Sequence, residues 1–352
     1  MHGGGRMAWR PSRRASKIRR MRRAVTMGAL GWVLAACQLA PPQAPAASPE
    51  PSGSPALRVE PAPPGARAKV LVLGIAQDAG VPQANDRCAN CRRARRDPAA
   101  RHFVASLALM DLEGRKTWLI DATPDIVHQL GMLESDPDLP LEPGRTPLAG
   151  LLLTHAHMGH YLGLAHFGRE AMASRELPVY ASRRMQGFLR ANGPWSQLVE
   201  LGHIRLMELV PGVAIELGSL SVVPLSVPHR DELSDTLGFL VRGPEKTLLY
   251  VPDIDKWHKW DHDLAALLRE VDWALVDGTF QSAAELPDRD LSEIPHPVVQ
   301  ETLEAAGDEA RGKLHFIHLN HSSPLLDPSS QALRALRERG VDVAREGQIF
   351  PL

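Results

Sequence analysis

One segment constrains the fold of this chain more than any other, the run LLLTHAHMGHYLGL at residues 151–164. A short apolar stretch leads directly into His155, His157 and His160, and a predicted helix follows. Two histidines spaced i, i+2 on an extended segment, with a third at a helix start, can converge on one point. Neutral imidazoles suit Zn²⁺ and similar ions. A lone His-x-His pair is as often a surface feature, but the third histidine favours a metal site at the end of a buried strand.

Other candidate ligands occupy the same kind of position further along the chain. His229, Asp253 and His318 each come at the end of a strand-like run, in SVPHRDEL, LLYVPDID and LHFIHLNH. Any one of them could instead cap an element or face solvent. Because all three follow apolar runs, the set is more consistent with ligands than with three unrelated polar residues.

Short apolar runs alternate with helical patterns from Lys69 onward. The strand-like runs are KVLVLGIAQ, TWLIDA, GLLLTHAH, LPVYAS, LSVVPLSV, TLLYVPDID, WALVDGTF and LHFIHLNH. The helical stretches are HYLGLAHFGREAMAS, DHDLAALLREV, HPVVQETLEAAG and SSQALRALRERG. This alternation predicts an α/β (α+β) layered domain over residues 67–352, with polar groups at the strand ends, where clefts form.

The motifs GIAQDAGVPQ, LIDATPDI, THAHMGH, PHRDELSDTLGF, YVPDID, DGTF and IHLNHSSP resemble the metallo-β-lactamase superfamily over residues 69–352. The similar subgroup contains coenzyme pyrroloquinoline quinone synthesis protein B and the phosphonate-pathway cyclic phosphodiesterase, and tRNase Z is more distant. TPDI, PHR and DGTF are closer to the quinone synthesis protein, whereas the intact histidine cluster is closer to the hydrolases. The resemblance implies a four-layer αββα sandwich.

The resemblance also implies a ligand set. The implied metal ligands are His155, His157 and His229 for one ion, His160 and His318 for a second, and Asp253 between them. The usual family motif is His-x-His-x-Asp-His, and this chain has Gly159 in place of the aspartate. We therefore expect the second ion to bind weakly, to be absent, or to be completed by water or a neighbour such as Asp121.

Hydrolysis by a metal-activated water is the mechanism that this site implies. Asp253 and His160 are the expected catalytic residues, with Asp253 able to accept a proton from water. Asp121 and Asp125 are candidates to orient imidazoles from behind, although Asp125 could serve a simple turn. His296 could face the substrate or merely begin a helix.

The mature domain contains one Cys-x-x-Cys pair, Cys88 and Cys91. Such a pair is half of a zinc site. The resemblance to the phosphodiesterase implies a structural zinc held by Asp86, Cys88, Cys91 and His321, with Asp86 where the relative has a cysteine. The alternative is a redox-active pair in an oxidising compartment.

The N-terminus predicts export. Residues 1–23 carry nine Arg or Lys and no acid, and an apolar run at 24–36 ends in Leu-Ala-Ala before Cys37. This pattern resembles a bacterial lipoprotein signal (1–36) with lipid attachment at Cys37, and implies a membrane-anchored protein facing the periplasm, on the outer membrane of a Gram-negative bacterium. An uncleaved anchor is the alternative. Residues 37–66 are rich in Pro, Ala and Ser and predict an extended tether.

Charge argues against nucleic acid as a partner. The whole chain has a net charge of −1, but without the nine N-terminal basic residues it has 31 basic against 41 acidic residues. A domain with a net charge of −10 is a poor match to a polyanion. Nothing in the sequence predicts an oligomeric state.

We therefore expect a metallohydrolase that acts on a small-molecule ester or phosphodiester. The expected cofactor is Zn²⁺, one or two ions at the active site and one structural, with iron or manganese also compatible with the active site. Two alternatives remain: a protein like quinone synthesis protein B, acting in cofactor synthesis with iron, and a catalytically weak binding lipoprotein.

Overall fold

The computed structural model describes residues 59, 61–139, 148–287, 289–290 and 293–352. They all belong to one compact unit, Gly53–Leu352. The predicted signal at 1–36, the predicted lipid attachment at Cys37 and most of the predicted tether lie outside the described residues. In the described part of the chain, no helix is both long enough and apolar enough to cross a membrane.

The first sheet has seven strands in the order β14-β1-β2-β3-β4-β5-β6. Their bounds are β1 Ala68–Gly74, β2 Ser106–Asp111, β3 Lys116–Ile120, β4 Gly150–Leu152, β5 Leu177–Ala181, β6 Ile204–Glu208 and β14 Ile349–Pro351. β1 and β3 both run antiparallel to β2, and β4 runs parallel to β3. The carboxyl ends of β1, β3 and β4 therefore lie at the same edge of this sheet.

The second sheet also has seven strands, in the order β13-β12-β11-β10-β9-β8-β7. Their bounds are β7 Ile215–Leu217, β8 Leu220–Val227, β9 Thr236–Arg242, β10 Thr247–Val251, β11 Trp273–Asp277, β12 Leu314–Ile317 and β13 Asp342–Val343. β10, β11 and β12 are parallel neighbours, and β8 runs in the same direction because both β8 and β10 are antiparallel to β9. These four strands end at one edge.

Alternate side chains of β1 pack on opposite faces of the first sheet, in two different apolar layers. Val70 and Val72 pack in the cluster that joins the two sheets, whereas Leu71 and Leu73 pack in a second cluster with helix residues. Both faces of the strand are buried, as expected for a strand between two apolar layers. The first sheet is therefore an inner layer of the domain.

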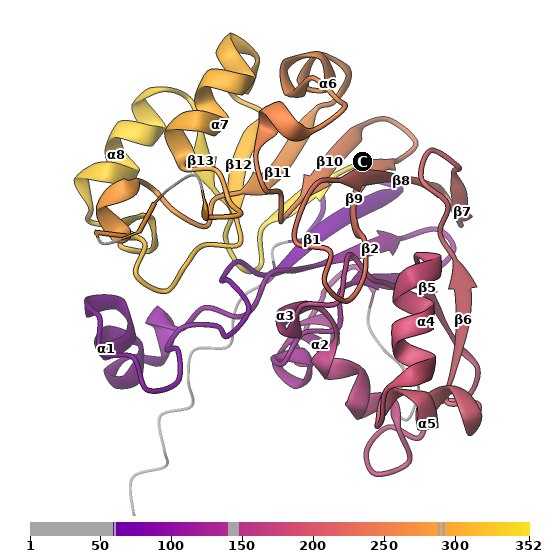
Figure 1. Ribbon diagram of the computed structural model, residues 1–352. Helices are drawn as coiled ribbons and strands as arrows, with labels where there is room; N and C mark the ends of the chain where they lie inside the picture. The colour runs from indigo at the N-terminus through magenta and orange to yellow at the C-terminus, as the bar shows by residue number, and fades with distance from the viewer. Residues whose placement is uncertain (1–58, 60, 140–147, 288, 291–292) are drawn as a thin grey trace, which may run out of the picture. The chain divides into compact units, whose positions relative to one another are not determined.

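Helices cover the outer face of each sheet (Figure 1). α2 Ile126–Glu134, α4 Arg183–Ala191 and α5 Trp195–Glu200 pack on the first sheet, and α6 Leu264–Glu270, α7 Val299–Ala306 and α8 Gln331–Glu338 pack on the second. The result is the predicted αββα sandwich.

All eight predicted apolar runs form strands, but one predicted helical stretch does not form a single helix. HYLGLAHFGREAMAS contains α3 Met158–Tyr161 and a 3₁₀ helix, Leu162–Phe167. Gly163 explains the change, because its N–H donates to the Ala122 carbonyl at 2.8 Å and a Cβ there would lie 2.2 Å from the Thr123 oxygen. Close packing on the loop after β3 therefore replaces a regular helix.

The last residues of the predicted tether lie against the domain. Val59 packs on the outer core cluster, and the Ala62 N–H donates to Asp138 Oδ2 at 2.7 Å. The described end of the predicted tether therefore has an apolar contact and a hydrogen bond with the domain.

Candidate metal centre

The predicted ligands come together from both sheets. The loops after β4, β8, β10 and β12 bring the six histidine and aspartate side chains to one place: His155, His157, His160, His229, Asp253 and His318. Their ligand atoms form several groups in which all atoms lie within 4.8 Å of one another, such as His155, His157 and His229, or His155, His160 and Asp253. Strand direction explains this, since side chains at co-directional strand ends meet at one edge.

Asp253 lies at the middle of the cluster. Its carboxylate oxygens are 3.3 Å from His160 Nε2, 3.7 Å from His229 Nε2 and 3.4 Å from His318 Nε2. The carboxyl group is almost fully buried, and burial raises its pKa to about 7. An aspartate between two groups of histidines is placed to bridge two cations.

Several polar atoms of the cluster are buried without a hydrogen-bond partner. They are His160 Nε2, both ring nitrogens of His229, His318 Nε2 and Asp253 Oδ2. Buried polar atoms are nearly always hydrogen-bonded, so convergent exceptions need an explanation. Imidazole nitrogens and a carboxylate oxygen pointing at a common centre fit a bound divalent transition metal.

Asp121 holds this cluster from behind. One carboxylate oxygen accepts the Thr154 N–H at 2.8 Å, and the other lies 2.7 Å from His160 Nδ1. Thr154 in turn bonds His155 Nδ1 through its hydroxyl at 3.0 Å. These contacts fix the imidazole rings so that their Nε2 atoms face Asp253 and His157. The structure thus places Asp121 behind the histidines and not, as one expectation had it, among the groups that complete the second site.

Burial and neighbouring charge separate the histidine pKa values. Burial lowers the pKa of His318 to about 3, and burial together with Arg230 lowers that of His157 to about 4. Burial opposes the charged form of His160 too, but Asp121 and Asp253 outweigh it and raise the pKa to about 9. Most of the rings are therefore neutral at pH 7, the form in which imidazole binds metals.

His296 and Asp125 occupy different places. His296 lies at the cluster, in a candidate group with His229 and Asp253, and its Nδ1 is 2.7 Å from Asp277. Asp125 instead accepts the Val104 N–H at 2.9 Å at the start of α2. The structure gives the described Asp125 no contact with the clustered histidines, so the expectation that it orients one of them is replaced by a local structural role.

Asp78 is a site residue that sequence reasoning missed. It follows β1 in GIAQDAG, and it forms a candidate group with His160 and His318. Its Oδ1 is 3.7 Å from His160 Nε2. The only sequence signal was its position four residues after a buried strand, the same kind of position that identified Asp253.

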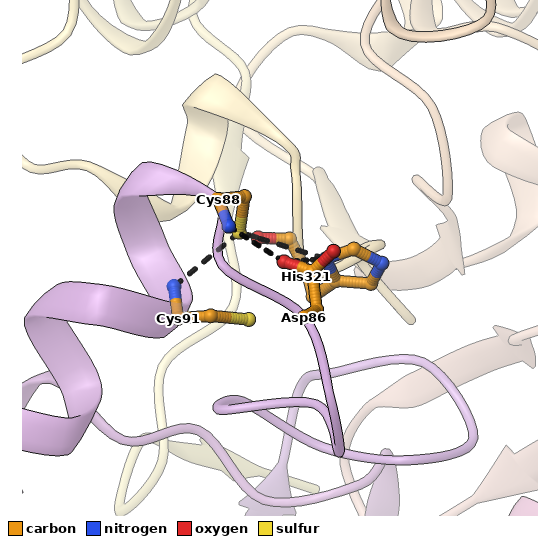
Figure 2. A group of neighbouring side chains, drawn as sticks. All are labelled: Asp86, Cys88, Cys91 and His321. Carbon is orange, nitrogen blue, oxygen red and sulfur yellow. Dashed lines mark hydrogen bonds and ion pairs between the residues drawn. The ribbon is translucent and has the colours of Figure 1, made fainter.

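The second predicted site is also assembled. Asp86, Cys88, Cys91 and His321 form a group with ligand atoms within 4.8 Å of one another. Figure 2 shows the side chains gathered at the start of helix α1 Ala89–Arg96. Cys88 Sγ lies 3.6 Å from His321 Nδ1, and Asp86 Oδ1 lies 3.4 Å from the same nitrogen. Both thiols are free, so the pair is not joined in a disulfide.

The hydrogen bonds and burial of this second group shift two pKa values in opposite directions. Hydrogen bonds from Cys88 to the carboxylate lower the pKa of Asp86 to about 2, whereas burial raises the pKa of the Cys91 thiol to about 12. A buried thiol of that kind is a poor redox nucleophile, because the thiolate is the reactive form. A metal ion would stabilise the thiolate instead.

The fold and the two residue groups define a metallo-β-lactamase sandwich with candidate sites for metal ions. Residues 116–319, more than half of the chain, match the beta-lactamase superfamily domain, and the chain belongs to that superfamily.

Curated relatives are similar over most of their length. The chain is 27% identical over 309 residues to coenzyme PQQ synthesis protein B of Methylobacillus flagellatus, covering 79% of this chain and 98% of that protein. It is 28% identical over 305 residues to the protein of the same name from Methylococcus capsulatus, with coverages of 79% and 98%.

Solved structures share the fold. Zn²⁺-bound PqqB from Methylobacterium extorquens has a TM-score of 0.68 at 22% identity, covering 81% of this chain and all of that one. A diphosphatase of the PhnP family has a TM-score of 0.59 at 22% identity, with coverages of 80% and 96%. At these identities the likeness concerns the fold.

Proposed function

We propose that the chain is a metal-dependent hydrolase that acts on a small phosphodiester or ester through metal-activated water. The observation that carries the proposal is the set of buried, unpartnered ring nitrogens of His160, His229 and His318 around Asp253. In a protein without a cation there, these ring nitrogens would be desolvated without a hydrogen bond, and only the contacts with Asp253 would offset that cost.

Two ions are accommodated by this donor set. His155, His157 and His229 would hold one, and His160 and His318 the other, with Asp253 between them. When bound, the ions lower the pKa of a water molecule toward neutrality and polarise the substrate oxygen. Asp253 lies among the histidine rings, where its carboxylate would hold the ions and could also accept a proton from water. Asp121 accepts a hydrogen bond from Nδ1 of His160, which favours the tautomer whose Nε2 is free to bind an ion.

Arg230 favours an anionic substrate over a neutral ester. Its guanidinium lies 3.5 Å from His157 Nδ1 and its side chain is half exposed at the edge of the cluster. Arg suits phosphate oxygens because its planar fork donates two hydrogen bonds. Met158 directly follows His157 in the chain and Leu233 lies three residues after Arg230, and these exposed apolar side chains would contact a small organic group. The PhnP-family structural neighbour is named as a diphosphatase, which is in keeping with a phosphoryl substrate.

Zn²⁺ is the proposed ion at both sites, since the second group contains two cysteines, which bind zinc as thiolates, and imidazole also suits zinc. The structural zinc would join residues before α1 to the loop after β12. Export, lipid attachment at Cys37 and a position facing the periplasm remain part of the proposal, as does the absence of a nucleic-acid partner. They rest on the sequence.

Metal analysis combined with a hydrolysis assay tests the proposal. The full chain, purified from medium containing both zinc and iron, should carry zinc and should cleave bis(p-nitrophenyl) phosphate faster than p-nitrophenyl acetate. A His155→Ala/His157→Ala chain should lose this activity and the histidine-bound metal. Metal content that does not depend on the two histidines would overturn the proposal, and bound metal without any turnover would favour the weak binding protein.

A second candidate is a role like that of coenzyme PQQ synthesis protein B, favoured by similarity that spans 98% of those relatives. Such a role would be cofactor synthesis with iron. Iron in place of zinc at the histidine site, with oxygen uptake upon reduction, would support this candidate over hydrolysis.

A further inference from the structure

Gly159 and Asp78 occupy one space from two different segments. A Cβ at residue 159 would lie 2.5 Å from Asp78 Oδ1 and 2.6 Å from Asp78 Cα. The Gly159 N–H donates to the same Oδ1 at 3.2 Å. The carboxylate therefore lies where any side chain at residue 159 would begin, and only glycine at this position leaves it room.

The same carboxylate faces the part of the cluster that lacks a ligand. Asp78 Oδ1 is 3.7 Å from His160 Nε2, and Asp78, His160 and His318 form a group with ligand atoms within 4.8 Å. Nε2 of His160 and Nε2 of His318 are both buried without a hydrogen-bond partner. The Asp78 side chain keeps 26% of its surface exposed, so water or substrate can approach the group from its side.

We propose that Asp78, from the loop after β1, supplies the carboxylate ligand of the second ion that residue 159 does not carry. The second ion is then held by Asp78, His160, His318 and the shared Asp253. This inference rests on the proposed metal centre, and it replaces the expectation of a weak or water-completed second site with a fully ligated one.

The arrangement makes residues 78 and 159 interdependent. Asp78 supplies charge and Gly159 supplies the space and one hydrogen bond, so changing either residue disturbs the same ion. A Cβ at residue 159 meets backbone of residue 78, which cannot rotate away as a side-chain tip can. The loop after β1 must then move outward, and its carboxylate moves with it.

The test measures ion binding by the full-length chain, independently of turnover. Zn²⁺ is titrated in competition with a chromophoric chelator, and Co²⁺ absorption reports coordination of each ion. Asp78→Asn keeps the size of the side chain, and it should raise the Kd of one histidine-dependent ion at least about 10-fold while the other is unchanged. Asp125→Asn is the matched control, because the partly buried carboxylate of Asp125 accepts a hydrogen bond from a backbone N–H and lies outside the cluster.

Gly159→Ala provides a second, independent variant. It removes no ligand, yet it should weaken the same ion as Asp78→Asn does. Gly131→Ala is its control, because a Cβ at Gly131 in α2 meets nothing within 4 Å.

The outcomes separate this inference from the proposed function. If the unmodified chain binds no ion that His155→Ala/His157→Ala removes, the proposed metal centre itself fails. If it binds two histidine-dependent ions and Asp78→Asn binds both as tightly, only the role of Asp78 is overturned. Binding of a single histidine-dependent ion by the unmodified chain would also overturn it.

Discussion

Asp121 and His160 form a fully buried pair, with Oδ2 of the aspartate 2.7 Å from Nδ1 of the histidine. The aspartate is also anchored by the N–H of Thr154, so it cannot turn away without breaking a second bond. The pair therefore fixes the direction in which His160 presents Nε2 to Asp253.

Asp121→Asn should weaken metal binding without removing a ligand. An amide carries no charge, and its NH₂ group offered to Nδ1 would favour the tautomer with the proton on Nε2, so we expect a 10- to 100-fold loss of affinity. Chelator competition on the purified chain measures it. Asp125→Asn should remain close to the unmodified chain, and equal losses in both variants would contradict the specific role of Asp121.

Removing the ions should lower the thermal stability of the chain. A ligand present at about 1,000 times its Kd stabilises the folded state by about 4 kcal/mol, which for a domain of this size is a shift of about 7 °C in Tm. Differential scanning calorimetry with and without a chelator measures the shift. His155→Ala/His157→Ala should show a smaller chelator effect, and an unchanged Tm in the original chain would count against resident metal.

Cys88→Ser/Cys91→Ser should remove one zinc per chain and leave the histidine-bound ions in place. The two groups share no ligand, although His318 and His321 both follow β12, and serine is a far poorer ligand than thiolate. Elemental analysis, with hydrolysis as a parallel readout, distinguishes the sites. Retained zinc in this variant, or loss of all metal at once, would contradict two independent sites.

His315 should contribute to acid sensitivity away from the metal centre. It packs near the rings of Trp273 and Phe350, and burial lowers its pKa. In the unfolded chain its pKa is about 6.5, so below pH 6.5 the unfolded state binds the extra proton and stability falls as pH falls, by up to about 1.4 kcal/mol per pH unit.

His315→Gln removes this proton uptake. Urea unfolding at pH 7 and pH 5 should show a smaller loss of the free energy of unfolding in the variant than in the original chain. Identical losses would mean that His315 is not protonated preferentially on unfolding. His315 Nδ1 also lies 3.2 Å from the backbone oxygen of Lys313, and this backbone group is the same in both proteins.

The strand ends were the part of the site that sequence could predict. Asp253 and His318 each follow an apolar run directly, and strand direction brings such residues together. Asp78 follows β1 by four residues and so has only a weak form of this signal, and its contact with Gly159, 81 residues away, depends on how two loops pack. Asp121 and Asp125 lie four residues apart in one motif, and only the end of β3 decides which of them reaches the histidines.

Continuous burial did not by itself decide which strands were predicted, because β2 and β9 are buried along all or nearly all of their length and were not among the predicted runs. β1 and β10 are apolar along their length, and their runs were found. β6, with largely half-exposed residues, and the three-residue β7 lack such a run and depend on their neighbours for pairing. Helix α4 was also missed, although its two buried residues are as many as those of α6 and α8, which were predicted.

Asp121 and His318 share one unusual backbone property, a positive φ of 68° and 62°. Residues other than glycine rarely adopt this backbone conformation, and each such residue carries about 1–3 kcal/mol of strain. Both lie directly after parallel strands, β3 of one sheet and β12 of the other, and both serve the same centre. Part of the free energy of folding is thus offset by backbone strain on either side of the candidate metal centre. Replacing either residue with glycine would relax that strain while losing the side chain, so such a chain could melt later than the original and still bind metal less tightly.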